Sequence, residues 1–473
     1  MSNFDFNNEE EEENINVSEL VERYENSVKD ERAIFLDHDE FEYIIDYYYH
    51  HSRLEDAARV IERALEQYPF SAAFLSRKAQ FLFDIKEVEE ALQLLDIAEM
   101  YERSESAVYF LRSDIYKYLG RYDEAIEVMQ NLLSQPDVMD IEDIYLQMCE
   151  VYEDWEKYNE AYDCIVASLE IDPLNEEALE RFTFCITMTS KYEESLPIHL
   201  RMIDENPYSY LAWYNLANSY RGLEKYELAV DAFEYAIAIN EDEEYLPFEL
   251  AELHYKFKQY QKALDVLKDM CEVYDSDEDV FFLQGKCHEA LGNNKMARYC
   301  YRKAVHENPI MSEAYFRIGE TYKIDGQWEQ AYKAFQKANE LEKEEYEFCL
   351  AMAEAALEIG ESDVALDVCE TAIDLFVKRH EAYFTMAKIM ATYGDFENAL
   401  AVVDTGLKIC KSTIELEYAK CAITFMSNKN KDAEILLRKL LQEHYIMHDY
   451  LYDFCDELSQ DNFVQEIIAD FSE

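Results

Sequence analysis

The chain has 473 residues, with 103 Asp or Glu against 43 Lys or Arg, so its formal net charge is −60. A surface this acidic repels nucleic acid and anionic membranes. It either attracts basic segments of other proteins or serves only to keep a long chain soluble and unaggregated. No run of about 18 apolar residues occurs, so a membrane-spanning helix is not predicted. The first residues have neither a basic start nor an apolar stretch, which argues against a secretory signal and favours a cytoplasmic protein.

The eleven cysteines are odd in number and form no C-x-x-C motif. Several of them, Cys149, Cys185, Cys287, Cys421 and Cys455, fall at or beside apolar positions of helical patterns. We interpret them as small buried thiols in a reducing compartment. The sequence therefore predicts no disulfide framework, no metal and no cofactor.

Two short segments come before the main pattern of the chain. Residues 1–16 are acidic, with five consecutive Glu at 9–13, and are predicted to form a disordered tail. Within residues 17–37, Ser18 is a candidate N-cap and Leu20, Val21 and Tyr24 share one helix face. We expect this segment to be a capping helix that covers an apolar edge of the residues after it.

From residue 38 the sequence repeats with a period of 34 residues. In the stretch 212–236, Trp213, Leu216, Ala217 and Tyr220 form one apolar helical stripe, and a second follows on the next helix. Steps of 34 residues from Ala229 reach a small residue each time, with one two-residue insertion near Val138–Ile141. These small residues are Ala57, Ala91, Ala125, Ala161, Ser195, Ala229, Ala263, Ala297, Ala331, Ala365, Ala399 and Ala433.

Twelve such copies resemble the tetratricopeptide repeat, abbreviated TPR, although Glu241 replaces the usual proline of the copy that contains Trp213. The resemblance rests on Trp213, Leu216, Ala217, Tyr220, Ala229, Phe233 and Ala236. It implies an all-α fold, an α-α superhelix or TPR solenoid of antiparallel helix pairs, with right-handed stacking. The twelve repeats would span residues 38–447, and residues 448–473 would form a C-terminal capping helix pair.

Glycine and proline mark strong and weak copies of the repeat. Five glycines fall at the same repeat position, between first and second helix, where a left-handed conformation ends a helix. They are Gly120, Gly292, Gly326, Gly360 and Gly394. Gly285 and Gly319 fall instead at a close-packing position. The fifth copy has Thr183 and Ser195 at small positions and Pro197 inside its second helix, so we predict that it is the softest internal joint.

The sequence carries no motif that indicates catalysis. It lacks the phosphate-binding, dinucleotide-binding, zinc-protease and nucleophile-elbow patterns. His444 and His448 are four residues apart, but no general base accompanies them, and we interpret the pair as a surface coincidence. We therefore predict that the chain is not an enzyme.

The fifth position of the first helix carries an aromatic or apolar residue in repeats six to twelve. The TPR resemblance places this stripe in a concave groove that binds peptides, with carboxylates around it. The predicted groove residues are Tyr214, Phe248, Glu252, Phe282, Glu313, Phe316, Glu320, Glu347, Leu350 and Phe384. Rings edged by acids suit a segment with basic and apolar residues. The alternative, that these rings pack against the neighbouring repeat as core, stays open.

These features together predict a non-enzymatic scaffold or adaptor for protein–protein interaction. Its partner would present a basic or apolar-basic peptide segment, and neither nucleic acid nor membrane is an expected partner. One alternative is a structural solenoid subunit of an oligomeric complex, for which self-association would be required. Another is a ligand-responsive regulator of a different enzyme.

Overall fold

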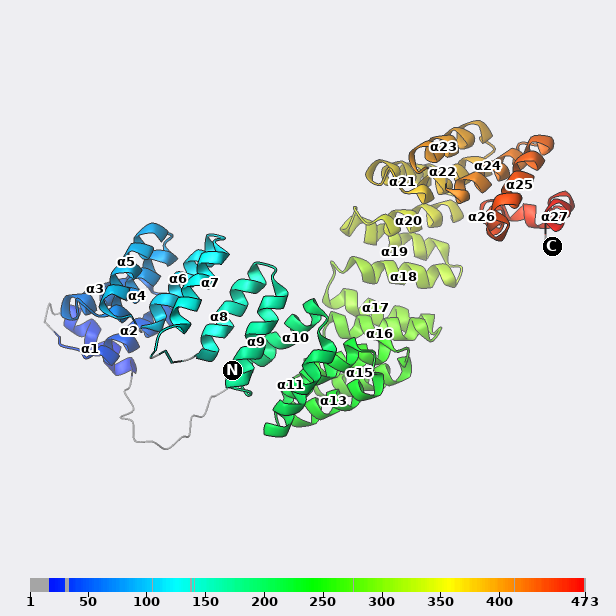
Figure 1. The fold of residues 1–473 in the computed structure, drawn as a ribbon. Helices are drawn as coiled ribbons and strands as arrows, with labels where there is room; N and C mark the ends of the chain where they lie inside the picture. The colour runs from blue at the N-terminus through cyan, green and yellow to red at the C-terminus, as the bar shows by residue number, and fades with distance from the viewer. Residues whose placement is uncertain are drawn as a thin grey trace. The chain divides into compact units, whose positions relative to one another are not determined.

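A computed structural model describes residues 17–29, 34–103, 105–136, 138–139, 141–274, 276–411 and 413–471. The predicted acidic tail at 1–16 lies outside the described residues. Every regular element in the described ranges is a helix (Figure 1), which confirms the predicted all-α fold of stacked helix pairs. No helix among these ranges combines the length and the apolar character needed to cross a membrane.

The chain divides into two compact units, residues 1–240 and 241–473. The first unit contains α1 (Val17–Lys29), α2 (His38–His50), α3 (Leu54–Gln67), α4 (Ala72–Asp84), α5 (Val88–Tyr101), α6 (Ser106–Tyr118), α7 (Tyr122–Leu133), α8 (Ile141–Asp154), α9 (Tyr158–Ile171), α10 (Glu176–Thr189), α11 (Tyr192–Glu205), α12 (Tyr210–Gly222) and α13 (Tyr226–Ile239).

The second unit contains α14 (Tyr245–Lys256), α15 (Tyr260–Val273), α16 (Glu278–Ala290), α17 (Asn294–Glu307), α18 (Ser312–Ile324), α19 (Trp328–Leu341), α20 (Tyr346–Glu358), α21 (Ser362–Leu375), α22 (His380–Thr392), α23 (Phe396–Ile409), α24 (Ile414–Met426), α25 (Asn430–His444), α26 (Asp449–Phe454) and α27 (Asn462–Ala469). Short 3-10 turns at Tyr445–Met447 and Asp456–Gln460 flank α26.

Consecutive helices from α2 to α25 form pairs in which an even-numbered first helix packs against the odd-numbered second helix after it. Within each unit, a second helix also packs against the next first helix, so neighbouring pairs of one unit bury their apolar stripes in one another. The first helices start 34 residues apart through most of the chain, because the same apolar spacing recurs in each copy.

The turn between first and second helix contains a left-handed residue in all twelve pairs. Five are the predicted glycines, with φ between 67° and 83°, and the other seven carry side chains. The twelve residues are Ser52, Lys86, Gly120, Glu156, Ser190, Glu224, Lys258, Gly292, Gly326, Gly360, Gly394 and Asn428. The geometry of the turn therefore imposes this conformation whether or not the sequence supplies glycine.

Close packing inside the pairs depends on small residues that face large rings. A Cβ atom at Gly285 would overlap the ring of Tyr301, and one at Gly319 would overlap the ring of Phe335. Both rings have no exposed surface. The predicted close-packing role of these two glycines is confirmed, because only the absence of a side chain lets the second helix place a ring there.

The fifth pair, α10 and α11, differs from this arrangement. Pro197 lies within α11, which remains helical through it. His199 is fully buried on the same helix, and its Nε2 lies 3.1 Å from the Ser219 hydroxyl on α12. The Ser195 hydroxyl lies 3.0 Å from the same oxygen. A polar cluster therefore occupies the place where the other pairs bury apolar side chains.

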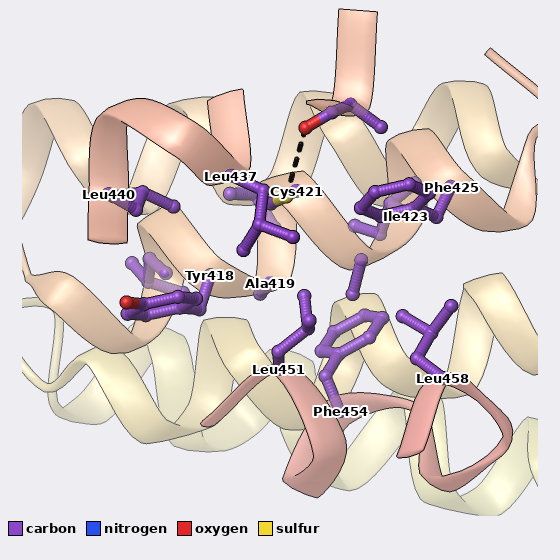
Figure 2. Packing of buried hydrophobic residues seen from close by; sticks show 14 of the residues in the cluster. Tyr418, Ala419, Cys421, Ile423, Phe425, Leu437, Leu440, Leu451, Phe454 and Leu458 are labelled. Atoms are coloured by element: carbon purple, nitrogen blue, oxygen red, sulfur yellow. Dashed lines mark hydrogen bonds between the residues drawn. The ribbon is translucent and has the colours of Figure 1, made fainter. Parts of the chain in front are cut away.

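Additional helices cover the two ends of the array. On α1, Leu20, Val21 and Tyr24 are buried in one cluster with residues of α2 and α3. At the other end, Leu451, Phe454 and Leu458 pack into the cluster built by α24 and α25, as Figure 2 shows. Both end pairs thus bury apolar side chains against a segment of the same chain.

Candidate functional site

The predicted groove residues lie on the first helices α12, α14, α16, α18, α20 and α22. Tyr214 belongs to the first unit, where its ring lies 6.0 Å from that of Phe233. The other nine belong to the second unit, and together they form what we call the first-helix face of that unit.

Two rings of this face are turned toward the core. Phe282 is only 9% exposed, and its centroid lies 5.4 Å from that of Tyr301. Phe248 is half-buried against the cluster that contains Leu267 and Leu283. Lys286 covers part of this region, with Nζ 5.6 Å from the Phe282 centroid. These rings therefore contribute mainly to packing between helices, and they offer a partner little surface.

Phe316 and Leu350 lie in an intermediate position, half-buried and half-accessible. The Phe316 ring stacks on Phe348 at 4.8 Å and contacts Phe335 at 5.6 Å. Leu350 packs beside Tyr346 and Cys349. Each side chain is anchored by neighbouring helices, yet it keeps an exposed edge on the first-helix face.

The end of this face is covered by the chain itself. The Phe384 ring meets the Phe454 ring of α26 edge-on at 5.2 Å, and Lys388 Nζ donates to the Asp453 carbonyl at 2.6 Å. Tyr418, at the same repeat position in α24, is fully buried (Figure 2) and donates its hydroxyl to the His444 carbonyl. The aromatic position on α22 thus holds a short helix, and the one on α24 is buried in the same cluster.

Carboxylates are concentrated on α16, α18 and α20, around a few cations. Lys323 Nζ lies 2.7 Å from Glu354 and 3.8 Å from Glu320. Arg317 lies 3.6 Å from both Glu289 and Glu313. We call these four acids the carboxylate row; they outnumber the two cations among them. Glu252 and Glu347 are exposed on the same face.

The pKa of Glu320, one acid of the carboxylate row, is raised above its ordinary value. Burial raises the pKa of this carboxyl, and the charges of Glu354 and Glu289 raise it further, against the opposing effects of Lys323 and Arg317. Negative charge on Glu320 is therefore costly in the free protein. A further cation placed beside Glu320 would relieve that cost.

Neither His444 nor His448 belongs to a group of three candidate metal ligands in the part of the chain that the structure describes. His448 uses Nδ1 on the Tyr445 carbonyl at 2.8 Å, and its Nε2 lies 3.8 Å from Asp449. In the described residues, one group of three side chains is close enough to share a metal ion, and it lies in the first unit at Cys149, Glu153 and Cys185.

Sequence reasoning missed the role of residues 449–458 as an occupant of the first-helix face. The apolar spacing of Leu451, Phe454 and Leu458 predicted a helix, but a helix periodicity does not say which surface it covers. One signal for this role was present in the sequence. Tyr418 is an aromatic residue at the groove position, beside the charged Glu417 and Lys420, and its ring needs a further segment of protein to cover it.

Repeated helix pairs with small residues facing large rings define a class of α-solenoid, and comparison with known proteins identifies it. Tetratricopeptide-repeat family models match residues 44–108, 106–135, 210–243 and 312–345. The chain therefore contains tetratricopeptide repeats in these segments.

Relatives with curated descriptions share this repeat. The TPR repeat-containing protein YpiA of Bacillus subtilis is 20% identical over 376 residues, which cover 78% of this chain and 87% of YpiA. The TPR repeat-containing protein MJ1428 of Methanocaldococcus jannaschii is 26% identical over 151 residues, 30% of this chain. The match spans only a quarter of the length of MJ1428, 25%.

Similar solved structures include YrrB, described as a TPR protein with an unusual peptide-binding site, and the MamA protein. YrrB is 19% identical, with a TM-score of 0.34 and coverage of 39% of this chain and 95% of YrrB. MamA is 15% identical, with a TM-score of 0.34 and coverage of 36% of this chain and 92% of MamA.

Proposed function

We propose that this protein is a non-enzymatic scaffold whose second unit binds a partner protein through its first-helix face. The partner segment carries basic residues between apolar ones. The apolar residues contact the exposed edges of Phe316 and Leu350, and the basic residues pair with Glu320 and Glu354 of the carboxylate row. Glu313 belongs to the same row, and Glu252 and Glu347 extend its negative surface.

The observation that carries this proposal is the packing of α26 on the same face. There, Phe454 meets Phe384 and the cationic Lys388 holds a backbone carbonyl of the docked segment. The chain thus uses two groove positions to hold an apolar helix of its own. Equivalent positions on α18 and α20 present a similar half-buried surface, which suits a segment supplied by another protein.

The aromatic and acidic parts of the face have different roles in this proposal. Exposed ion pairs add little affinity each, so the exposed edges of Phe316 and Leu350 supply most of the binding free energy. The carboxylate row raises the association rate, because opposite charge steers the encounter at low salt. Phe282 and Phe248 act mainly by supporting the face, given their burial.

The test uses a random peptide library displayed on phage and selected on the full chain. We expect enrichment of sequences with Lys or Arg between apolar residues. A synthetic fluorescent copy of the best binder is then measured against variants. Phe316→Ala should weaken binding about tenfold or more. Glu320→Gln with Glu354→Gln should slow association and flatten its dependence on salt.

The matched control removes the same charge from a different surface. Glu370 and Asp374 are exposed on the second helix α21, and Glu370→Gln with Asp374→Asn should leave binding unchanged. Equal loss in both double variants would show that only the net charge matters. If Phe316→Ala lowers the melting temperature but leaves the affinity unchanged, that ring is core and the proposed face is wrong.

The alternative of a fixed structural oligomer gains no support from the ends of the array. An apolar edge on an end pair would favour it, but α1 covers the first pair and α26 and α27 cover the last one in the described residues. Sedimentation of the pure chain distinguishes the two functions, because the scaffold is monomeric without its partner.

A further inference from the structure

Two cysteines and one glutamate meet in the first unit, whereas the first-helix face belongs to the second. Cys149 and Glu153 are one turn apart on α8, so both project from one side of that helix. Cys185 comes from α10, the first helix of the next pair. The two Sγ atoms lie 4.0 Å apart, and each lies 3.4 Å from the same oxygen, Oε1 of Glu153.

These distances correspond to one face of a zinc coordination tetrahedron. With zinc–sulfur bonds of about 2.3 Å and a zinc–oxygen bond of about 2.0–2.2 Å, tetrahedral angles place two sulfurs about 3.8 Å apart and sulfur about 3.5 Å from oxygen. The observed separations of 4.0 and 3.4 Å agree with both. The three ligand atoms are thus in place without a change of helix position.

Other groups prepare the glutamate for this role. Arg181 donates to the second oxygen of Glu153 at 3.0 Å and to Glu150 at 2.5 Å, which fixes the carboxylate with Oε1 toward the thiols. Such an outer hydrogen bond is typical of metal-ligating carboxylates. Two thiolates, Glu153 and a divalent ion together carry one negative charge, and Arg181, which also pairs with Glu150 and Glu177, offsets part of it.

The cluster is buried but not sealed. Both cysteines have no exposed surface, whereas the Glu153 side chain is 16% exposed. Glu153 also borders a surface hollow with Glu177, Glu180 and Arg181. An ion can therefore approach past carboxylates and reach the thiols through Glu153, and water can occupy the fourth coordination position from the same side.

We propose that Cys149, Glu153 and Cys185 bind one zinc ion that links α8 to α10. On binding, the zinc ion displaces the two thiol protons, which leave to solvent, and two zinc–thiolate bonds form. The ion joins the fourth pair to the fifth, whose second helix contains Pro197. It thereby stabilises the part of the first unit that the sequence marks as weak. The absence of a C-x-x-C motif concealed the site, because its two cysteines are 36 residues apart.

The test uses the full chain, reduced, treated with a chelator, desalted and titrated with Co²⁺ without oxygen. We expect one Co²⁺ per chain, a near-ultraviolet thiolate-to-cobalt absorption band and visible bands of tetrahedral cobalt. Added Zn²⁺ should remove them, because zinc binds such a site more tightly than cobalt. Cys149→Ser and Cys185→Ser should each weaken binding by more than the roughly 10–100-fold that loss of an outer partner costs.

Two further variants separate the site from a general effect of thiols. Cys369→Ser removes an equally buried cysteine from the second unit and should leave the cobalt spectrum unchanged. Glu153→Gln retains both thiols and should weaken binding while it keeps the thiolate band. Zn²⁺ should raise the unfolding temperature of the wild type and of Cys369→Ser but not that of Cys149→Ser. No thiolate band in the wild type, or the same band in the Cys149→Ser, Cys185→Ser double variant, overturns the proposal.

Discussion

His199 in α11 and Phe335 in α19 occupy the same repeat position, four repeats apart, and both side chains have no exposed surface. The Phe335 ring fills the space above Gly319. The His199 ring lies 5.0 Å from Phe182 and uses Nε2 on the Ser219 hydroxyl. One position of the repeat thus holds an apolar ring in α19 and a polar ring in α11.

The difference shows that this buried position of the repeat accepts a polar ring as well as an apolar one. A polar ring in this position needs partners, and His199 Nδ1 has none in the described residues. Burial lowers the pKa of His199 to about 3, so the ring is neutral at physiological pH. The first unit therefore contains a position that responds to acid, while its counterpart in the second unit does not.

The largest expected change is a loss of stability, and it concerns Phe335, the apolar residue of this comparison. Phe335→Ala removes a fully buried ring that faces a glycine, and neighbours cannot close the cavity, so the loss of stability should be about 3–5 kcal/mol. Denaturant unfolding and hydrogen exchange in α18 and α19 measure it. Tyr299→Ala, at an exposed ring of α17, is the control and should change stability by less than about 0.5 kcal/mol. A loss at Phe335 no larger than at Tyr299 would contradict the packing argument.

The next largest change is a gain of stability, and it concerns the fifth pair, α10 and α11. Pro197 lacks the N–H that would bond to the Glu193 carbonyl, so Pro197→Ala should stabilise the first unit by up to about 3 kcal/mol. Hydrogen exchange over residues 176–207 should become slower relative to 210–241. Pro247 lies in the first turn of α14, where proline is tolerated, so Pro247→Ala should change little. Equal responses at the two prolines would refute the prediction that the fifth pair is soft.

Acid should destabilise the first unit through His199. The pKa of His199 in the folded chain is about 3, below the ordinary value of 6.5. Between pH 3 and pH 6.5 the unfolded chain therefore binds a proton that the folded chain does not bind. No cost is present above pH 6.5, and stability falls by about 1.4 kcal/mol per pH unit below it. His199→Phe should abolish this local dependence in α11 and α12. Unchanged acid sensitivity of these helices in His199→Phe would show that other groups cause it.

The smallest effect concerns the turns between helices. Four of the six left-handed turn residues in the second unit are glycine, against one of six in the first. Glu156→Gly and Glu224→Gly should therefore each stabilise the first unit by about 0.5–1 kcal/mol. Gly360→Ala should cost about 1 kcal/mol, and its added Cβ meets nothing within 4 Å, so the cost is conformational only. Thermal unfolding that gives both changes the same sign would rule out backbone strain as the cause.

The positions of the helices could be predicted closely, because the 34-residue period places apolar and small residues identically in each copy. The candidate face was predicted only in outline. The sequence placed Phe282, Phe316 and Phe384 on one stripe, but the structure gives them different environments. Phe282 is nearly buried, Phe316 keeps an exposed edge, and Phe384 is covered by Phe454. A stripe defines direction around a helix axis, whereas exposure depends on every element that packs there.

By itself, the sequence determined the repeat, the helix pairs and the glycines that must be left-handed. It also identified the proline inside α11 that is predicted to weaken the fifth pair. These properties are local or recur at a fixed spacing, so elementary helix geometry is enough to find them. The tertiary structure decided that α26 covers the end of the first-helix face, that His199 replaces a buried ring, and that Cys185 meets Cys149 and Glu153. Each of these depends on contacts between different repeats, where side-chain size and hydrogen-bond partners, rather than spacing, select the neighbour.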